Sequence, residues 1–357
     1  MATLHATPFR VGAASWLVPV RAAIVSLVGA GILFVLMAID MSVGDFPIPV
    51  REVMATLLGQ GDPGQQFVVM ELRLPQTAVA LAVGAALGLA GALTQTLARN
   101  PLASPDILGI TEGAAFGAVA VIVLSGASGY GAGLVAGTFA ELGVPVAAFV
   151  GALLTAVLLW AFSWRKGLDI QRVVLVGIGL GAALTAGTSY LLVNARIQDA
   201  ASAQVWLSGS LNARGWEHAR PVLLVLALML PLSLYLVRSL NAMLLGDDAA
   251  RGLGVRLQAT QLGVLLAAVA LSAVSVAAVG PLAFVAFVCP QIALRLVGGS
   301  RPPVLASMVC GGILVVGSDV LVRAVLPFTL PAGIVTAAIG APYLIYLLVR
   351  TNRRRNA

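Results

Sequence analysis

Ten predominantly apolar runs, each 16 to 23 residues long, divide this chain from near its beginning to near its end. A run of this length matches the hydrocarbon core of a bilayer crossed by an α-helix, so the choice of fold is narrow. The sequence predicts an all-α polytopic membrane protein with about ten transmembrane helices. The runs are residues 22–39, 76–98, 107–125, 144–163, 173–193, 221–237, 261–279, 282–297, 304–322 and 332–349.

The composition excludes a water-soluble domain of ordinary type. Hydrophobic residues make up 60% of the chain and charged residues 10%, with a mean hydropathy of +1.01. Soluble domains carry about 25% charged residues. The run 282–297 is the least regular, because it contains Pro290 and Arg295. The first run is long and lacks a small-residue cleavage site, so we expect it to remain in the protein.

Basic residues indicate the orientation, because cytoplasmic loops carry an excess of Lys and Arg. With the N-terminus inside, 15 of the 21 basic residues fall on the cytoplasmic side and six outside. Both termini are predicted to be cytoplasmic, with residues 1–21 as an N-terminal tail, 22–350 as the transmembrane domain and 351–357 as a basic tail. The net charge of +7 then reflects topology and contact with membrane lipid, and no nucleic-acid partner is expected. The six outer residues are Arg51, Arg73, Arg196, Arg214, Arg220 and Arg323.

Cysteine and histidine give no sign of metal or hydrolytic chemistry. Cys289 and Cys310 lie in apolar runs without a CxxC pattern, and we expect two buried thiols, no metal site and no cofactor bound by this chain. His5 lies in the N-terminal tail and His218 is expected in an outer loop. No HExxH pattern exists, which disfavours a membrane-embedded hydrolase.

Ionisable residues in or beside the apolar runs are few: Asp106, Glu112, Arg295 and Asp319. A charge in lipid is costly, so each should face protein or water. Glu112 has two open interpretations, a place at the inner mouth of a pathway or an ion pair with Arg99 or another basic residue.

Small residues and short connections complete the pattern. Glycine pairs at helical spacing should let neighbouring backbones approach closely. A short helix is predicted at about 51–58, and the longest cytoplasmic connection spans 238–261. The pairs are Gly84 and Gly88, Gly113 and Gly117, and Gly177 and Gly181.

Several long motifs resemble the FecCD-type permeases, which import iron-siderophore complexes, haem and cobalamin through ABC transporters. They are "ELRLPQTAVALAVGAALGLAGALTQTLARNPLASPDILGITEGAAFGA", "LLGDDAARGLGV", "VGPLAFVAFVCPQIA" and "LPAGIVTAAIGAPYLIYLL", in family order from about residue 70 to 350. The stretches "SWRKGLDIQRVVLVGIG" and "GDDAARGLGV" are most similar to the second permease subunit of catecholate-siderophore importers.

The resemblance implies a type II ABC importer permease fold and a set of partners. Two permease chains would enclose the path, as a heterodimer with a second permease subunit or as a homodimer. A siderophore-binding protein would dock outside, and two ATPase subunits using ATP and Mg would dock inside. This chain has no Walker motif and is expected to be no enzyme.

Three groups of site residues follow from the resemblance. For the outer group, Gln76 replaces a family arginine, and lipid snorkelling of Arg73 is the alternative. A capped loop helix is the alternative for the inner group, which lies in a coupling segment at about 240–258. Gln291 stands where relatives commonly have histidine. The groups are ATPase coupling by Gly246, Asp247, Asp248, Ala249, Ala250, Arg251, Gly252, Leu253 and Gly254; binding-protein docking by Arg73, Gln76 and Arg323; and a translocation path or gate at Asn100, Pro101, Glu112, Pro290 and Gln291.

The expected function is that of the permease subunit of a ferric-siderophore importer in a bacterial cytoplasmic membrane. Two alternatives stay open. An ion-coupled secondary transporter is suggested by Glu112 and Asp319, and the same importer type could carry haem or cobalamin.

Overall fold

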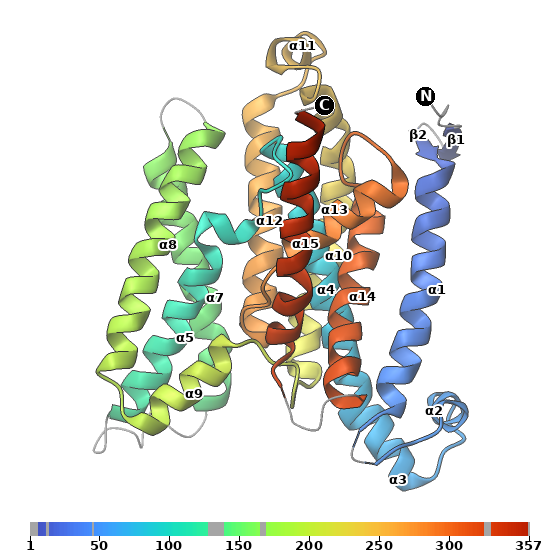
Figure 1. Cartoon of the computed structure of the whole chain (residues 1–357), viewed down its shortest axis with the longest axis vertical. Helices are drawn as coiled ribbons and strands as arrows, with labels where there is room; N and C mark the ends of the chain where they lie inside the picture. The colour runs from blue at the N-terminus through green and yellow to red at the C-terminus, as the bar shows by residue number, and fades with distance from the viewer. Residues whose placement is uncertain are drawn as a thin grey trace.

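The computed structural model describes residues 6–11, 14–44, 46–127, 139–164, 169–324 and 330–355. Within these ranges, each of the ten predicted spans corresponds to a helix (Figure 1). Seven candidate spans are long and apolar enough to cross a membrane, and α5, α13 and α15 contain shorter apolar stretches. The helices are α1 (Val20–Ser42), α4 (Leu74–Leu97), α5 (Ile110–Ala127), α7 (Phe139–Ser163), α8 (Ile170–Val193), α10 (Trp216–Met243), α12 (Leu257–Val279), α13 (Val285–Val297), α14 (Val304–Ala324) and α15 (Ala332–Arg355).

Shorter elements lie between these helices. The helix predicted at about 51–58 is confirmed as α2, whereas α9 was not expected. A two-stranded antiparallel hairpin precedes α1, so the predicted N-terminal tail contains strands, and Val20 and Arg21 already belong to α1. The elements are β1 (Ala6–Val11), β2 (Ala14–Pro19), α2 (Val50–Leu57), α3 (Pro63–Gln66), the π-helix η1 (Phe67–Arg73), the 3-10 helix η2 (Pro105–Leu108), α9 (Ile197–Leu207) and α11 (Asp247–Gly252).

Some of the residues used in the predictions lie outside the described ranges. These are residues 1–5 and 356–357 of the two tails, and Arg165 and Lys166 of the charge count.

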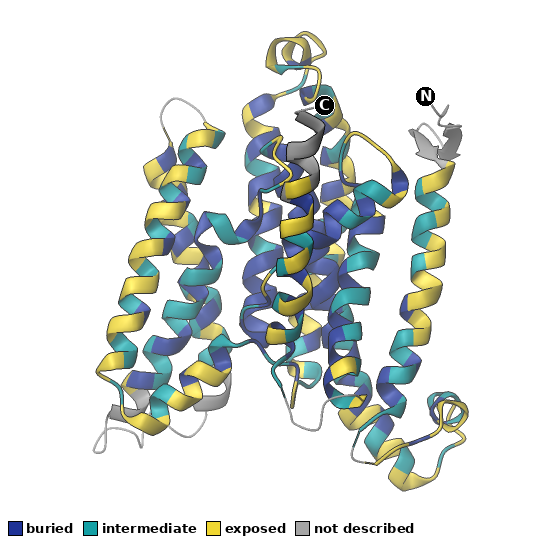
Figure 2. Cartoon of the chain, viewed as in Figure 1, coloured by how far each residue is buried: buried dark blue, intermediate teal, exposed yellow. Residues whose placement is uncertain are grey.

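Helix α4 forms the centre of the fold. It packs against α14, α12, α10 and α13, and 20 of its 24 residues are buried. The span that includes α4 is 89% buried in its most apolar part, against 17% for α1 and for α10. Figure 2 shows the contrast between the buried central helices and the exposed faces of α1 and α8. Because lipid solvates leucine and valine as well as protein does, the exposed apolar faces of the outer helices fit a bilayer.

Glycine allows the close packing around α4. A Cβ atom added to Gly84 would lie 2.4 Å from the Gly311 carbonyl oxygen of α14. A Cβ atom on Gly91 would lie 1.7 Å from the Ala286 carbonyl oxygen of α13. In the other predicted pairs, Gly117 faces the Ala147 backbone of α7 and Gly177 faces the η2 backbone, whereas a Cβ atom on Gly181 would make only ordinary contacts, the nearest at 3.6 Å. Small residues thus set the distance between helices, as the sequence predicted.

The remaining helices form a second group beside α4. Helices α5, α7, α8 and α9 pack together, and α12 contacts both α7 and α4 (Figure 1). The start of α1, the end of α15 and α11 lie at one end of the molecule, opposite α2, α3 and α9 (Figure 1). The start of α1, the end of α15 and the predicted coupling segment therefore share one end of the molecule, and the cytoplasmic location of that end stays a prediction.

Candidate functional site

Helix α11 is a short helix that projects from the end of the helical bundle (Figure 1). Asp247 and Asp248 occupy its first turn, where carboxylates complement the helix dipole. Gly246 and Gly254 flank it with φ angles of 106° and 81°, which favour glycine. The Asp248 side chain is 98% exposed and pairs with Arg251 at 2.8 Å. The surface of α11 is therefore open to a partner.

Arg99 ties this helix to the centre of the fold. Its Nη2 donates to Asp247 Oδ1 at 2.5 Å and to the Met243 carbonyl oxygen at 2.6 Å. Arg99 lies just after α4, so one side chain connects α4, the end of α10 and α11. The alternative in which Arg99 pairs with Glu112 is wrong, because Asp247 is its carboxylate partner.

The turn between α4 and α5 separates two cavities of about 510 Å³ each. Asn100 and Gln261 line the first, and Glu112 and Phe284 line the second. Ser104 contributes to both. Asn100 and Glu112, predicted to line one path, thus lie in cavities on either side of η2.

Glu112 is the least satisfied polar residue of this region. Its Oε2 atom is buried and has no hydrogen-bond partner among the described residues. The nearby Asp106 accepts a hydrogen bond from the Thr111 hydroxyl at 2.7 Å. A carboxylate oxygen at a cavity wall without a protein donor is suited to meet water or a passing polar group.

Pro290 and Gln291 are buried residues of α13, which packs against α4, and they line neither of these two cavities. Gln291 Nε2 donates to Gln95 Oε1 at 2.7 Å, and Gln95 Nε2 donates to the Phe287 carbonyl oxygen at 2.9 Å. Pro290 has no N–H, so the helical hydrogen bond to the Ala286 carbonyl is missing. The sequence analysis missed Gln95. Pro101 lies apart from this pair, exposed in the turn after α4.

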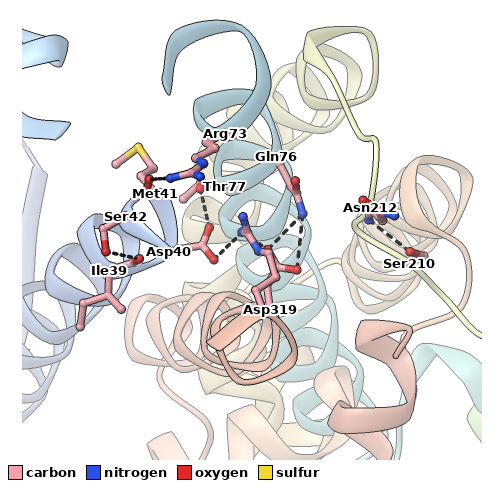
Figure 3. A network of polar contacts seen from close by, with 11 residues as sticks. Ile39, Asp40, Met41, Ser42, Arg73, Gln76, Thr77, Ser210, Asn212 and Asp319 are labelled. Carbon is pink, nitrogen blue, oxygen red and sulfur yellow. Dashed lines mark hydrogen bonds and ion pairs between the residues drawn. The ribbon is translucent and has the colours of Figure 1, made fainter. Parts of the chain in front are cut away.

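Of the three residues predicted to dock a binding protein, Arg73 and Gln76 lie near each other on adjoining turns (Figure 3), and Arg323 meets Gln76 at Asp319. Arg73 donates to the Met41 carbonyl oxygen at 2.8 Å and to the Phe46 carbonyl oxygen at 2.5 Å, and is 7% exposed. Its guanidinium points into protein, so the snorkelling alternative is wrong. Gln76 donates to Asp319 Oδ2 at 3.2 Å.

Arg323 binds two buried carboxylates. It contacts Asp40 at 2.6 Å and also pairs with Asp319, four residues earlier on α14. The Thr77 hydroxyl donates to the other oxygen of Asp40 at 2.5 Å. This network, Asp40, Gln76, Thr77, Asp319 and Arg323, joins α1, α4 and α14, and we call it the outer network. Asp40 was missed, although its place at the end of the first apolar run was a usable signal. Docking by Arg73 and Arg323 stays a prediction, since both are engaged within this chain.

Metal-ligating side chains do not gather anywhere in the described part of the chain, where no group of three or more was found. Cys289 and Cys310 are both free thiols, buried and half-buried, respectively.

Comparison with known proteins supplies the family. The sequence model of the FecCD transport family matches residues 32–350. The chain belongs to the FecCD transport family. It is 37% identical over 313 residues to the ferric enterobactin transport system permease protein FepG of Escherichia coli (strain K12), covering 87% of this chain and 91% of that protein. It is 38% identical over 327 residues to the Fe(3+)-citrate import system permease protein YfmE of Bacillus subtilis (strain 168), covering 90% and 93%.

A solved structure agrees along nearly its whole length. It shows an inward-facing conformation of a metal-chelate type ABC transporter, with a TM-score of 0.78 and 27% identity, covering 92% of this chain and 99% of that one. The chain is therefore a multi-pass permease of the cytoplasmic membrane and not an enzyme. As the permease component of an ABC importer, it works with ATPase and binding-protein partners.

Proposed function

We propose that this permease carries a ferric siderophore, as one half of a heterodimer with a second permease subunit. The observation that supports this substrate most is the similarity to the ferric enterobactin permease along 91% of that protein's length. A chelated ferric ion already has its ligands, so the path needs no metal-binding cluster of its own.

Two ATPase subunits would dock on residues Gly246–Gly254, hydrolysing ATP with Mg, while this chain binds no cofactor. A displacement of α11 would reach α4 through Arg99, because the guanidinium bonds to both Asp247 and the end of α10. The two cavities lie beside this connection. Asn100, Pro101 and Glu112 would form the inner part of the path, and the Gln95–Gln291 pair would hold α13 against α4.

The binding protein would dock at the opposite end, over Arg73, Gln76 and Arg323. Arg323 is engaged by Asp40 and Asp319, so an acidic residue of the binding protein would compete with these carboxylates. The same pairing weakens the ion-coupled alternative, because Asp319 already has a cationic partner within the chain.

The test of the substrate is uptake of a labelled ferric siderophore into right-side-out membrane vesicles that contain ATP. Uptake is compared in vesicles with and without this subunit. We expect ATP-dependent uptake that is lost when the subunit is absent and insensitive to excess haem or cobalamin. Undiminished uptake without the subunit would contradict the proposal, and competition by haem or cobalamin would move it to that substrate.

The docking surface is tested at Asp248, which takes no part in the Arg99 contact. Asp248→Lys should reduce co-purification of the ATPase subunits, because it reverses a charge on a 98% exposed side chain. Asp62→Lys, an exposed position at the opposite end of the molecule, is the matched control. Equal ATPase recovery from both variants would refute docking on α11.

A further inference from the structure

A cavity outside the sites described above lies between α7, α10 and α12, with a volume of about 750 Å³. Its walls are mainly apolar and include Pro145, Phe149, Leu224 and Val274. Three polar residues, Arg214, Glu217 and His218, also line it. They lie at the start of α10, and Leu224 follows about 10 Å further along that helix. The cavity is therefore polar at the membrane surface and apolar toward the membrane interior.

The three polar residues form one chain of hydrogen bonds. Arg214 Nη1 lies 3.0 Å from His218 Nε2, and His218 Nδ1 lies 3.0 Å from Glu217 Oε1. A guanidinium can only donate, so Nε2 of the imidazole accepts and Nδ1 carries the proton that is donated to Glu217. A neutral His218, 15% exposed in its side chain, thus holds a cation and a carboxylate at fixed places. His218 was expected in a loop, but it belongs to the first turn of α10.

Arg214 has donor capacity beyond this chain of bonds. Its Nε donates to the Ser210 carbonyl oxygen at 3.3 Å, and Nη2 makes no hydrogen bond within the described part of the protein. Burial lowers the pKa of the Arg214 guanidinium, which the nearby Glu217 carboxylate partly offsets. An anion beside Nη2 would stabilise this cation. The Glu217 side chain, 59% exposed, is accessible from outside.

We propose that this cavity binds a phospholipid with an ethanolamine headgroup, taken from the leaflet that faces the start of α10. The phosphate lies against Arg214, the ammonium group against Glu217, and an acyl chain runs along Phe149 and Val274. The charges favour this headgroup, since one cation and one carboxylate match a zwitterion. A glycerol headgroup offers Glu217 no cation, and a choline headgroup offers it no N–H donor.

The bound lipid would fill the space between α7 and α10, two helices that are otherwise connected through α12. Both helices pack against α12. The lipid is thus expected to stabilise the fold, by an amount that rises with its concentration relative to its dissociation constant.

The test is native mass spectrometry of the detergent-solubilised permease complex, titrated with dioleoyl phosphatidylethanolamine, phosphatidylglycerol or phosphatidylcholine. We expect the ethanolamine lipid to bind most tightly, and Arg214→Gln to weaken it about tenfold. Glu217→Gln should remove the preference for ethanolamine over choline while leaving binding of phosphatidylglycerol unchanged or stronger. Arg220→Gln, an exposed position on the same helix, is the control and should change nothing.

The remaining outcomes overturn the proposal. Equal affinity of the three lipids for the unaltered protein would show a nonselective apolar groove. Unchanged ethanolamine-lipid binding in Arg214→Gln would place the lipid elsewhere. Loss of the second permease subunit in Arg214→Gln, with lipid binding intact, would show that a protein covers this surface. Unchanged lipid binding in Phe149→Trp, which narrows the cavity without touching the charges, would likewise place the lipid elsewhere.

Discussion

Replacing Gly91 by alanine should separate α4 from α13. The added Cβ would lie 1.7 Å from the Ala286 carbonyl oxygen, whereas real Cβ contacts essentially never fall below 3.0 Å. The backbones must therefore move apart by about 1.3 Å, the difference between these two distances. The neighbouring hydrogen bond from Gln95 Nε2 to the Phe287 carbonyl oxygen, now 2.9 Å long, would stretch beyond bonding distance.

The cost follows from two contributions. Overpacking of a close-packed interface costs about 1–3 kcal/mol. Each buried polar group left without a partner, here at Gln95 and Gln291, costs about 1–3 kcal/mol. We expect Gly91→Ala to lower the free energy of unfolding by about 3–9 kcal/mol in all.

The assay is thermal unfolding of the purified protein, followed by fluorescence-detected size-exclusion chromatography. Gly317→Ala is the matched control, because a Cβ there meets no atom within 4 Å. Alanine at that position should leave the stability unchanged or raise it slightly, through its higher helix propensity. Equal unfolding temperatures for the two variants would refute the claim that glycine sets the distance between α4 and α13.

Two further changes test the charged contacts. Arg323→Gln should lower the free energy of unfolding by about 3–5 kcal/mol, because it leaves Asp40 and Asp319 buried without their cation. In thermal unfolding, adding Asp319→Asn to this variant should restore part of the lost stability, and no restoration would contradict the pairing. Arg99→Gln and Asp247→Asn should each cost less than about 1 kcal/mol of stability, since the pair is 44% and 47% exposed. Both should nevertheless lower the amount of substrate moved per ATP hydrolysed, and unchanged coupling in both variants would exclude this contact from the transmission path.

The membrane-spanning helices could be predicted because their signal is local. An apolar run long enough to cross a bilayer identifies a helix whatever it packs against, and all ten runs correspond to helices. The ends were less accurate. The sixth run was expected at 221–237, but α10 spans Trp216–Met243, because polar residues such as His218 continue the helix.

The site contacts could not be predicted because they join distant parts of the chain. Gln95 and Gln291 are separated by 196 residues, and Asp40 and Arg323 by 283. Nothing near Gln95 distinguishes it from any other polar residue at a helix end. Arg99 was correctly placed at the end of α4, but its partner was Asp247 rather than Glu112.

Identifying the source of energy for transport tests the central claim most directly. The measurement is uptake of a ferric siderophore into proteoliposomes that contain this permease, its second permease subunit and the ATPase subunits, with the binding protein outside. If the chain is the permease of an ABC importer, uptake requires internal ATP, stops with vanadate and continues when ionophores collapse ion gradients. Uptake that resists vanadate and stops with ionophores would contradict it and identify an ion-coupled transporter.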